Sequence, residues 1–391
     1  MPKSALNTPL PRLTETGIYL HIPYCKSKCR YCSFNSHAGR EDEIAAYIAA
    51  LLLHIKNTAD LPWCQGRIFS TLYLGGGTPT ICESKALSSL IHSCLSLFPF
   101  APNPEITVET NPNTLSFDKL VALRQSGVNR LSIGVQSFAA DELKMLGRSH
   151  TSGDAIEAFT LARRAGFDNI SLDLMFGLPG QTAKIWRDTL ETALRLSPDH
   201  FSLYELMVET GTPLAAMIER KELILPPENE VVEMTIVTDA LLAAAGFKRY
   251  EISNYAKTGF PCRHNMNYWE NESWLGLGAG AVASFSGMKI SNVSDPALYI
   301  QRINSGRSPY SDIECLSREA LFRETVIMGL RMIRGVSINN LKKRFGFHPR
   351  AYYGKEMDRL LEKDMLVVEG DYLRLTDRAL PVANQALSQL V

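Results

Sequence analysis

The sequence predicts an α/β fold, a partial barrel of six βα units followed by a smaller carboxyl-terminal domain. Short apolar runs alternate with amphipathic segments from residue 18 to residue 245, which is the pattern of parallel βαβ units. Polar residues come directly after successive apolar runs. In a barrel the carboxyl ends of the strands meet around one mouth, whereas a doubly wound open sheet spreads them along an edge. The polar residues therefore favour the barrel.

Six apolar runs are predicted to be the barrel strands, and each precedes a segment with helical periodicity. The predicted strands cover residues 18–22, 69–74, 105–109, 130–135, 170–174 and 201–206. The predicted helices cover residues 41–56, 83–98, 116–125, 152–165, 182–196 and 228–245. The runs are mostly apolar, which indicates strands that are buried on both faces.

The repeat divides the chain into four parts. Residues 1–16 are a leader, residues 17–250 form the barrel, residues 251–312 connect, and residues 313–391 form the second domain. The connecting segment is rich in Asn, Tyr, Trp and Gly, a composition that suits a layer lying over a site.

The last part of the chain has the outline of a winged helix. Helices are predicted near residues 318–332, 338–345 and 350–363, followed by a hairpin over residues 366–375. Such a domain can bind DNA through a recognition helix. The basic run at residues 342–344 is offset by nearby acids, so a docking domain is favoured and no nucleic-acid partner is expected.

Composition limits the classes of function. The 391 residues contain 41 Lys and Arg and 41 Asp and Glu, so no overall charge attracts nucleic acid or an anionic membrane. The amino terminus lacks the pattern of a signal peptide and no apolar run could span a bilayer, which predicts a cytoplasmic protein. Disulfides are then not expected. The scattered thiols are interpreted as core or surface cysteines: Cys64, Cys82, Cys94, Cys262 and Cys315.

Three further cysteines form a cluster after the first strand. Cys25, Cys29 and Cys32 are spaced C-x3-C-x2-C, and three thiolates from one loop suit an iron-sulfur cluster or a zinc ion. A cubane cluster held by three cysteines leaves one iron open to a small chelating ligand. Zinc would need a fourth protein ligand, which His21 or His37 could supply. The spacing alone leaves both metals open.

The cysteine motif, with aromatic Tyr31 before its last cysteine, resembles the signature of the radical S-adenosylmethionine superfamily. The run Gly75-Gly76-Gly77-Thr78-Pro79 after the second strand is similar to that superfamily's element for the methionine amino group. Glycines allow close approach of the backbone to a ligand, although most such runs are simply turns. The resemblance implies one [4Fe-4S] cluster, S-adenosylmethionine at its open iron, and an electron donor for the cluster.

Four segments narrow the resemblance to the branch that contains oxygen-independent coproporphyrinogen III oxidase. They are residues 21–25, 105–109, 130–138 and 173–180. The resemblance implies that cluster-bound S-adenosylmethionine contacts Tyr19, Gly76, Gly77, Thr78 and Glu109. It also implies that a second S-adenosylmethionine contacts Gln136, Arg148 and Asp173.

Each of the charged residues among these has a structural alternative. Glu109 could cap the next helix region, and Arg148 could pair with Asp141 or Glu142 on the surface. Asp173 could be a structural carboxylate under the barrel mouth. For Glu109 and Asp173 the site interpretation is favoured, because a charge inside a barrel mouth is costly unless a ligand or partner satisfies it.

Within this branch, two departures from the oxidase resemble the HemW group of radical S-adenosylmethionine haem chaperones. Phe34 stands where the oxidase has a further cysteine, and the segment before the first strand is short. Residues 264–269 also match that group's His-Asn-x-x-Tyr-Trp motif, in which the histidine is linked to haem binding. The alternative is that His264 only bonds a neighbouring loop while Tyr268 and Trp269 are core. Val282 stands where relatives commonly have histidine.

The sequence gives rise to a leading hypothesis and three alternatives. The leading hypothesis is a haem chaperone that binds haem or porphyrin and transfers haem to an acceptor, which could be a transiently bound membrane protein. The first alternative is an oxygen-independent coproporphyrinogen III oxidase, which decarboxylates two propionates to vinyl groups. The second is a related radical methyltransferase. A DNA-binding regulator ranks last because the charges balance.

Overall fold

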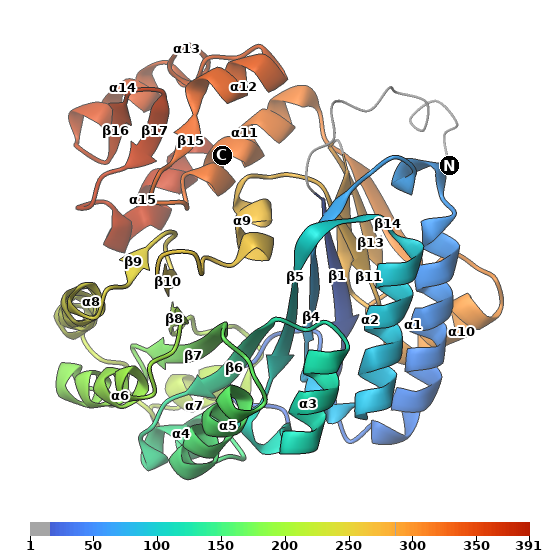
Figure 1. Cartoon of the computed structure of the whole chain (residues 1–391). Coiled ribbons are helices and arrows are strands. Elements are labelled where there is room, and N and C mark those ends of the chain that lie inside the picture. Colours follow the sequence, from blue (N-terminus) through green and yellow to red (C-terminus); the bar gives the residue numbers. More distant parts are fainter. Residues whose placement is uncertain (1–15, 286) are drawn as a thin grey trace.

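The computed structural model describes residues 16–285 and 287–391. Apart from Thr16, the predicted leader lies outside the described residues. A twelve-stranded mixed sheet forms the centre of the molecule (Figure 1). In spatial order its strands are β14 (Tyr310–Cys315), β13 (Met288–Asn292), β12 (Val282–Phe285), β11 (Trp274–Leu277), β1 (Thr16–Ile22), β4 (Phe69–Gly76), β5 (Phe100–Thr110), β6 (Arg130–Gln136), β7 (Ile170–Phe176), β8 (His200–Glu205), β10 (Asn254–Ala256) and β9 (Lys248–Arg249).

The predicted six βα units are confirmed. Strands β1, β4, β5, β6, β7 and β8 are neighbours in that order and all run parallel. The helices that follow them include α1 (Ile44–Ala59), α2 (Ser84–Leu97), α3 (Phe117–Gln125), α5 (Ser152–Arg164), α6 (Ala183–Arg195) and α8 (Glu228–Ala244). In the described part of the chain, the outermost strands β14 and β9 do not pair with each other. The sheet is therefore open, as a partial barrel requires.

The strands form because their residues are buried between the inside of the sheet and the helices outside it. Ile18, Leu72 and Val108 on successive strands are fully buried, and the helices α1, α2 and α3 lie along the outer side (Figure 1). Helix α6 contributes Trp186, which is also fully buried. Burial of apolar area at roughly 25 cal/mol per Å² is the main stabilising contribution of such a core. This rigid scaffold fixes the loops at the strand ends.

Two short helices were not expected from the sequence. Helix α4 (Ala140–Leu146) follows β6, and α7 (Pro213–Glu219) follows β8. Each is only seven residues long, too short for a clear period of 3.6 residues. Both pack Leu146 and Leu214 into a small apolar cluster under the cysteine loop. They therefore help to support that loop.

The connecting segment continues the sheet, whereas its composition predicted a layer lying over the site. Strand β11 pairs parallel with β1, and β12, β13 and β14 add antiparallel neighbours. Helix α9 (Arg263–Trp269) lies before β11 and packs against β1 and β4. Helix α10 (Pro296–Asn304) packs against α1. The segment thus places α9 beside the first two strands of the barrel.

The carboxyl-terminal domain has its own core. It contains α11 (Arg318–Gly329), β15 (Val336–Ser337), α12 (Ile338–Phe345), α13 (Pro349–Tyr353), α14 (Lys355–Glu362), β16 (Leu366–Glu369), β17 (Tyr372–Leu375) and α15 (Ala383–Leu387). The helix predicted over residues 350–363 is interrupted at Gly354. Strand β17 pairs with β15 and β16 in a three-stranded sheet, and Phe322, Leu341 and Leu360 are buried between sheet and helices.

This domain contacts the last residue of α9 and the residues that follow this helix. Arg344 donates hydrogen bonds to the carbonyl of Glu270 at 3.3 Å and to the Glu272 carboxylate at 3.2 Å. The Arg331 guanidinium lies 4.7 Å from the centre of the Trp269 ring. Part of the basic run on α12 is therefore used for docking. Within the described residues, no helix has the length and apolar character needed to cross a membrane.

Candidate functional site at the barrel mouth

The cysteine loop is held between both halves of the barrel mouth. Its two ends pair as β2 (Tyr24–Cys25) and β3 (His37–Ala38). On one side the backbone N–H of Thr78 donates to the Tyr24 carbonyl at 2.7 Å. On the other side the Arg30 N–H donates to the Leu146 carbonyl at 3.0 Å, and Tyr31 packs on the apolar cluster formed with α4 and α7. These contacts fix the positions of Cys25, Cys29 and Cys32, which are half-buried.

Two glycines after β4 are required by this close packing. A Cβ on Gly77 would lie 2.5 Å from the Tyr24 carbonyl oxygen. Gly76 has a φ of +112°, and a Cβ there would lie 2.5 Å from the His21 ring. No larger residue fits at either position without a shift of the backbone. The glycine run predicted as a ligand cradle therefore also lets β4 meet the cysteine loop.

The next side chain, Glu109 at the end of β5, lies beside the glycine run. Its carboxylate accepts hydrogen bonds from the Gly76 N–H at 3.0 Å and from the Tyr73 hydroxyl at 2.8 Å. Burial raises the pKa of Glu109 to about 7. A carboxylate held in this way favours a cationic group, such as an ammonium, in the adjoining space. The prediction that Glu109 faces the mouth agrees with these contacts.

Arg148 lies against the cysteine loop. Its guanidinium donates to the Cys29 Sγ at 3.4 Å and to the carbonyl of Gly134 on β6. Glu142, one of its two proposed surface partners, instead accepts a hydrogen bond from the Ser137 hydroxyl. Arg148 therefore links the end of β6 to the loop. Gln136 follows at the end of β6 with a φ of +68°, a strained conformation that costs roughly 1–3 kcal/mol and is typical of functional positions.

Asp173 on β7 is surrounded by serine hydroxyls. Ser132 Oγ lies 2.9 Å from both of its carboxylate oxygens, and Ser171 Oγ lies 3.1 Å from one of them. Ser171 in turn contacts the buried ring of His200 at 2.8 Å. Burial raises the pKa of Asp173. These contacts satisfy much of the carboxylate without a ligand, so a ligand role for Asp173 stays a prediction.

Tyr19 and His21, on β1, form one hydrogen-bonded pair in the mouth. The Tyr19 hydroxyl lies 2.9 Å from His21 Nδ1, and His21 Nε2 lies 2.8 Å from the carbonyl of Asn35. The other candidate zinc ligand, His37, lies 3.3 Å from the Asn35 side-chain oxygen through Nε2. Both histidines thus make contacts with Asn35 and hold the far end of the cysteine loop.

A second tyrosine and histidine pair comes from α9. His264 is 1% exposed, and its Nδ1 lies 2.7 Å from the Thr71 hydroxyl while its Nε2 lies 2.9 Å from the Tyr268 hydroxyl. Burial lowers the pKa of His264 to about 3, so the ring is neutral. Its face stacks on Tyr73 at 4.9 Å between ring centres. Both ring nitrogens therefore have partners within the protein.

A cavity of about 410 Å³ joins these groups. It is lined by Tyr19, His21, Phe34, Asn35, Gly76, Glu109, Tyr268, Trp274, Gly280, Ala281 and Val282. Phe34 is 66% exposed and Val282 is 36% exposed, so both lie at the rim. Phe34, which differs from the oxidase, and Val282, which stands where relatives commonly have histidine, thus belong to one cavity. His264 does not line the cavity, whereas Tyr268 does.

Sequence reasoning missed two residues of this cavity. Asn35 donates hydrogen bonds to the carbonyls of Ala279 and Ser294 at 3.1 and 3.0 Å, which ties the cysteine loop to the β11–β12 connection and to the residues that follow β13. Trp274 packs edge-on against Tyr268, with 4.8 Å between ring centres. A glycine-rich segment such as residues 276–280 permits close approach of another backbone. The sequence alone does not indicate which loop would approach this segment.

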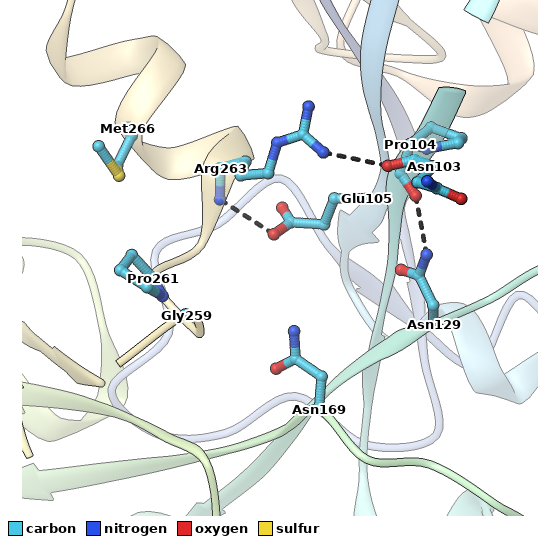
Figure 2. Close-up of a pocket in the computed structure, with 9 residues that line it drawn as sticks. All are labelled: Asn103, Pro104, Glu105, Asn129, Asn169, Gly259, Pro261, Arg263 and Met266. Carbon is cyan, nitrogen blue, oxygen red and sulfur yellow. Dashed lines mark hydrogen bonds between the residues drawn. The ribbon is translucent and has the colours of Figure 1, made fainter. Parts of the chain in front are cut away.

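A second pocket, of about 350 Å³, lies at the opposite ends of the strands (Figure 2). Glu105 at its centre accepts hydrogen bonds from the backbone N–H groups of Arg263 and His264, both at 3.0 Å. Arg263 also donates to the Asn103 carbonyl at 3.2 Å. Figure 2 shows Glu105 pointing toward the start of α9. Glu105 thereby anchors the helix that carries His264 and Tyr268.

The residues at the mouth fit an iron-sulfur cluster and a bound S-adenosylmethionine. Among residues 16–285 and 287–391, no three His, Cys, Asp or Glu side chains lie close enough to hold a single metal ion. A cubane binds its thiolates through different iron atoms, so its ligands need not meet at one point. Thr78 and Arg148 donate to the sulfurs of Cys25 and Cys29, and such hydrogen bonds tune a cluster. The buried Asn111 side-chain oxygen has no protein partner among the described residues.

Fold and site together define a radical S-adenosylmethionine protein. A model of the radical SAM superfamily matches residues 19–193, and a model of the HemN C-terminal domain matches residues 316–382. The superfamily implies a [4Fe-4S] cluster and S-adenosylmethionine. The solved structure of coproporphyrinogen III oxidase (HemN) from Escherichia coli superposes with a TM-score of 0.84 over 97% of this chain and 90% of that chain. At 23% identity this likeness shows the fold alone.

Curated relatives narrow the assignment. The chain is 39% identical to the protein named heme chaperone HemW of Bacillus subtilis, over 88% of each chain. It is 30% identical to the heme chaperone HemW of Lactococcus lactis, over 95% of this chain and 96% of the relative. With the Mycobacterium tuberculosis protein of the same name it shares 32% identity, over 96% and 94%. The chain belongs to the HemW family of radical S-adenosylmethionine proteins.

Proposed function

We propose that this chain binds haem and passes it to an acceptor protein, on a scaffold that holds a [4Fe-4S] cluster through Cys25, Cys29 and Cys32. The observation that carries the proposal is the cavity beside the cysteine loop. Its wall includes the aromatic rings of Phe34, Tyr268 and Trp274. Flat aromatic surface suits a macrocycle, and cavities of roughly 300–1,000 Å³ are typical of ligand sites. The printed name of the relatives agrees with this ligand.

In the same proposal, S-adenosylmethionine lies at the open iron beside Gly76, Gly77 and Thr78. Glu109 provides the negative charge that pairs with the methionine ammonium, and Tyr19 lies next to it in the same cavity. The cluster, when bound, supplies the electron needed for reductive cleavage of S-adenosylmethionine. The protein holds the charges in place and shields the site: Tyr31 and the apolar cluster below it exclude water from one side of the loop.

Further contacts at the mouth are proposed for Gln136, Arg148 and Asp173. The strained backbone of Gln136 and the position of Arg148 against Cys29 support roles close to the cluster. A second S-adenosylmethionine would lie here. Partners of the protein would be a reductant for the cluster and a haem acceptor, for which a membrane protein remains a candidate. The docking contacts of Arg344 favour an internal role for α12 over contact with nucleic acid.

The lining of the cavity separates the leading function from porphyrinogen oxidation. Among the described residues that line it there is no Lys or Arg. Coproporphyrinogen III carries several propionates, and a site for it needs several basic side chains. Haem presents a largely apolar face to a wall of aromatic rings. The cavity therefore suits haem better.

Anaerobic cluster reconstitution followed by ferric haem titration tests the proposal. We expect stoichiometric haem binding, and no protoporphyrinogen when coproporphyrinogen III, S-adenosylmethionine and a reductant are supplied together. Formation of protoporphyrinogen would instead establish the oxidase. A methylated product with S-adenosylhomocysteine would establish a methyltransferase.

A further inference from the structure

Four side chains that line the cavity carry an oxygen or nitrogen able to bind iron: Tyr19, His21, Glu109 and Tyr268. Histidine and tyrosine are both known axial ligands of haem iron. Which of the four is able to do so depends on what its donor atom already contacts. The inference that follows rests on the proposed function, since it names the group that would hold the haem iron.

His21 has no free ring nitrogen, and the proposed function already uses the carboxylate of Glu109. His21 contacts the Tyr19 hydroxyl through one ring nitrogen and the Asn35 carbonyl through the other. Glu109 accepts one hydrogen bond on each carboxylate oxygen, from Tyr73 and from Gly76. Ligation of iron by His21 would break a buried hydrogen bond and leave its partner unsatisfied, at a cost. Each oxygen of Glu109 keeps a free lone pair, but in the proposed function this carboxylate pairs with the methionine ammonium of S-adenosylmethionine. Neither is the favoured ligand.

Tyr19 is fixed as a hydrogen-bond donor. The Asn35 carbonyl can only accept, so in the neutral His21 ring Nε2 carries the hydrogen and Nδ1 is an acceptor. The Tyr19 hydroxyl must then donate to His21 Nδ1. Loss of its proton would place a phenolate against the lone pair of Nδ1. Tyr19 is therefore held as a phenol.

Tyr268 is not restricted in this way. Its partner His264 contacts the Thr71 hydroxyl through Nδ1, and a hydroxyl can donate as well as accept. When Thr71 donates to Nδ1, the Nε2–H of His264 donates to the Tyr268 oxygen. This arrangement satisfies a phenolate. The same two neighbours therefore stabilise Tyr268 with or without its proton.

The surroundings of Tyr268 also suit a macrocycle. Trp274 lies edge-on to its ring and donates its indole N–H to the carbonyl of Val282 at 2.8 Å. The three side chains Tyr268, Trp274 and Val282 thus form one wall of the cavity. Glu105 fixes the start of the same helix from the other end of the barrel. The hydroxyl of Tyr268 is accordingly held at a defined point in the cavity.

We propose that Tyr268 is the axial ligand of ferric haem in this cavity, and that His264 is a positioning residue that hydrogen-bonds to the ligated oxygen. One bond forms between the iron and the Tyr268 oxygen. The hydroxide on ferric haem in water leaves as water with the phenol proton, so charge and atoms balance. His264, which is buried behind Tyr268, acts on haem through Tyr268. Loss of haem in a His264 variant would follow from this arrangement without a bond between imidazole and iron.

The test is ferric haem titration of the full-length, cluster-loaded chain, followed by resonance Raman spectroscopy. We expect phenolate modes coupled to iron in the unmodified protein. Tyr268→Phe should lose these modes and bind ferric haem at least about tenfold more weakly. His264→Gln keeps an N–H group for the Tyr268 oxygen and should retain shifted phenolate modes. His264→Leu should weaken binding about tenfold.

Tyr299→Phe is the matched control. Tyr299 also bonds to a histidine, His54, at 2.8 Å, but both are buried and neither lines the cavity. The Tyr299→Phe variant should bind haem as the unmodified protein does. Circular dichroism of all variants checks their folding. A spectrum of imidazole ligation that survives in Tyr268→Phe and disappears in His264→Gln would overturn the inference. Absence of stoichiometric haem binding in the unmodified protein would instead overturn the proposed function itself.

Discussion

Two pairs, each of one tyrosine and one histidine, lie at the same cavity. They differ in the group that the second histidine nitrogen contacts. In the pair from β1, His21 turns its second nitrogen to a backbone carbonyl, which fixes Tyr19 as a donor. In the pair from α9, the second nitrogen of His264 contacts the Thr71 hydroxyl. Tyr268 can therefore be either a phenol or a phenolate. In each pair, the partner of the second histidine nitrogen decides whether the tyrosine must keep its proton. In the proposed function, the first pair lies on the side of the cavity next to the cluster, here called the cluster side, and the second lies on the side that binds haem, the haem side.

The largest expected effect is loss of the cluster without loss of haem binding. Cys29→Ala should abolish the [4Fe-4S] cluster, because a cubane held by two thiolates lacks a ligand for a second iron. Haem binding at Tyr268 should persist, since the three cysteines do not line the cavity. Iron and sulfide analysis with electron paramagnetic resonance measures the cluster.

Cys315→Ala removes an exposed thiol and is the matched control. A Cys29→Ala protein with a full complement of cluster iron would refute the assignment of the cysteine loop.

The second expected effect concerns Glu109 on the cluster side. Glu109→Gln should weaken S-adenosylmethionine binding about 10–100-fold, because a hydrogen bond to a charged group is worth roughly 1.5–3 kcal/mol. Isothermal titration calorimetry at pH 8 measures the affinity. In the unmodified protein, affinity should fall below about pH 7, where the raised pKa of Glu109 leaves its carboxyl protonated. Equal affinities for the two proteins would contradict this role.

Glu109 also makes the stability of the ligand-free protein depend on pH. Stability should fall as pH rises, whereas affinity for S-adenosylmethionine should fall as pH decreases. The pKa of Glu109 rises from 4.5 to about 7 on folding, so the folded state binds the proton more tightly. The stability gained from that proton is complete below pH 4.5 and is lost as pH rises through 7. At about 1.36 kcal/mol per pKa unit, the loss is about 3 kcal/mol. Urea unfolding of Glu109→Gln without ligands should lack this pH dependence.

A smaller effect is expected on the haem side from the opposite end of the barrel. Glu105→Ala removes the acceptor for two backbone N–H groups at the start of α9, which should cost about 2 kcal/mol of unfolding free energy. Haem affinity should fall severalfold because Tyr268 is held less precisely. Chemical denaturation and haem titration measure the two changes. Glu314→Ala, at an exposed position on β14, is the control, and an unchanged haem affinity would show that α9 needs no anchor there.

The smallest effect is expected at Arg148. Arg148→Met removes a positive charge and a hydrogen-bond donor 3.4 Å from the Cys29 sulfur. The reduced cluster carries one more negative charge, so its reduction potential should become more negative by roughly tens of millivolts. Spectroelectrochemical titration measures the shift. Lys144→Met removes an exposed charge from the neighbouring helix α4, and an equal shift in that variant would show that Arg148 has no specific effect.

The sequence predicted the barrel half of this comparison well. Strand and helix periodicity located the six parallel strands of the βα units, because most of their residues are buried. Gly76 and Glu109 were predicted to face the mouth, since side chains at the ends of parallel strands converge. Regular strand geometry therefore predicts which side chains at the ends of adjacent parallel strands lie close together.

The part of the cavity formed by α9 and by strands β11–β14 could not be predicted in the same way. His264 and Tyr268 were singled out, but their exposure depends on Thr71 and Glu105, which lie far away in the sequence. The strands β11–β14 were also missed, because a segment rich in Gly and Asn has little β-propensity and forms strands only by pairing with β1. Tertiary packing, which a local pattern does not contain, decides which side chain reaches the cavity.

One measurement tests the central claim most directly. Resonance Raman spectra of the ferric haem complex can be recorded from protein made with ring-deuterated tyrosine and from unlabelled protein. Iron-coupled bands that shift with the label are expected in the unmodified chain and should be missing from Tyr268→Phe. Bands that do not respond to the label, in a protein that still binds haem stoichiometrically, would contradict the claim that Tyr268 holds the iron.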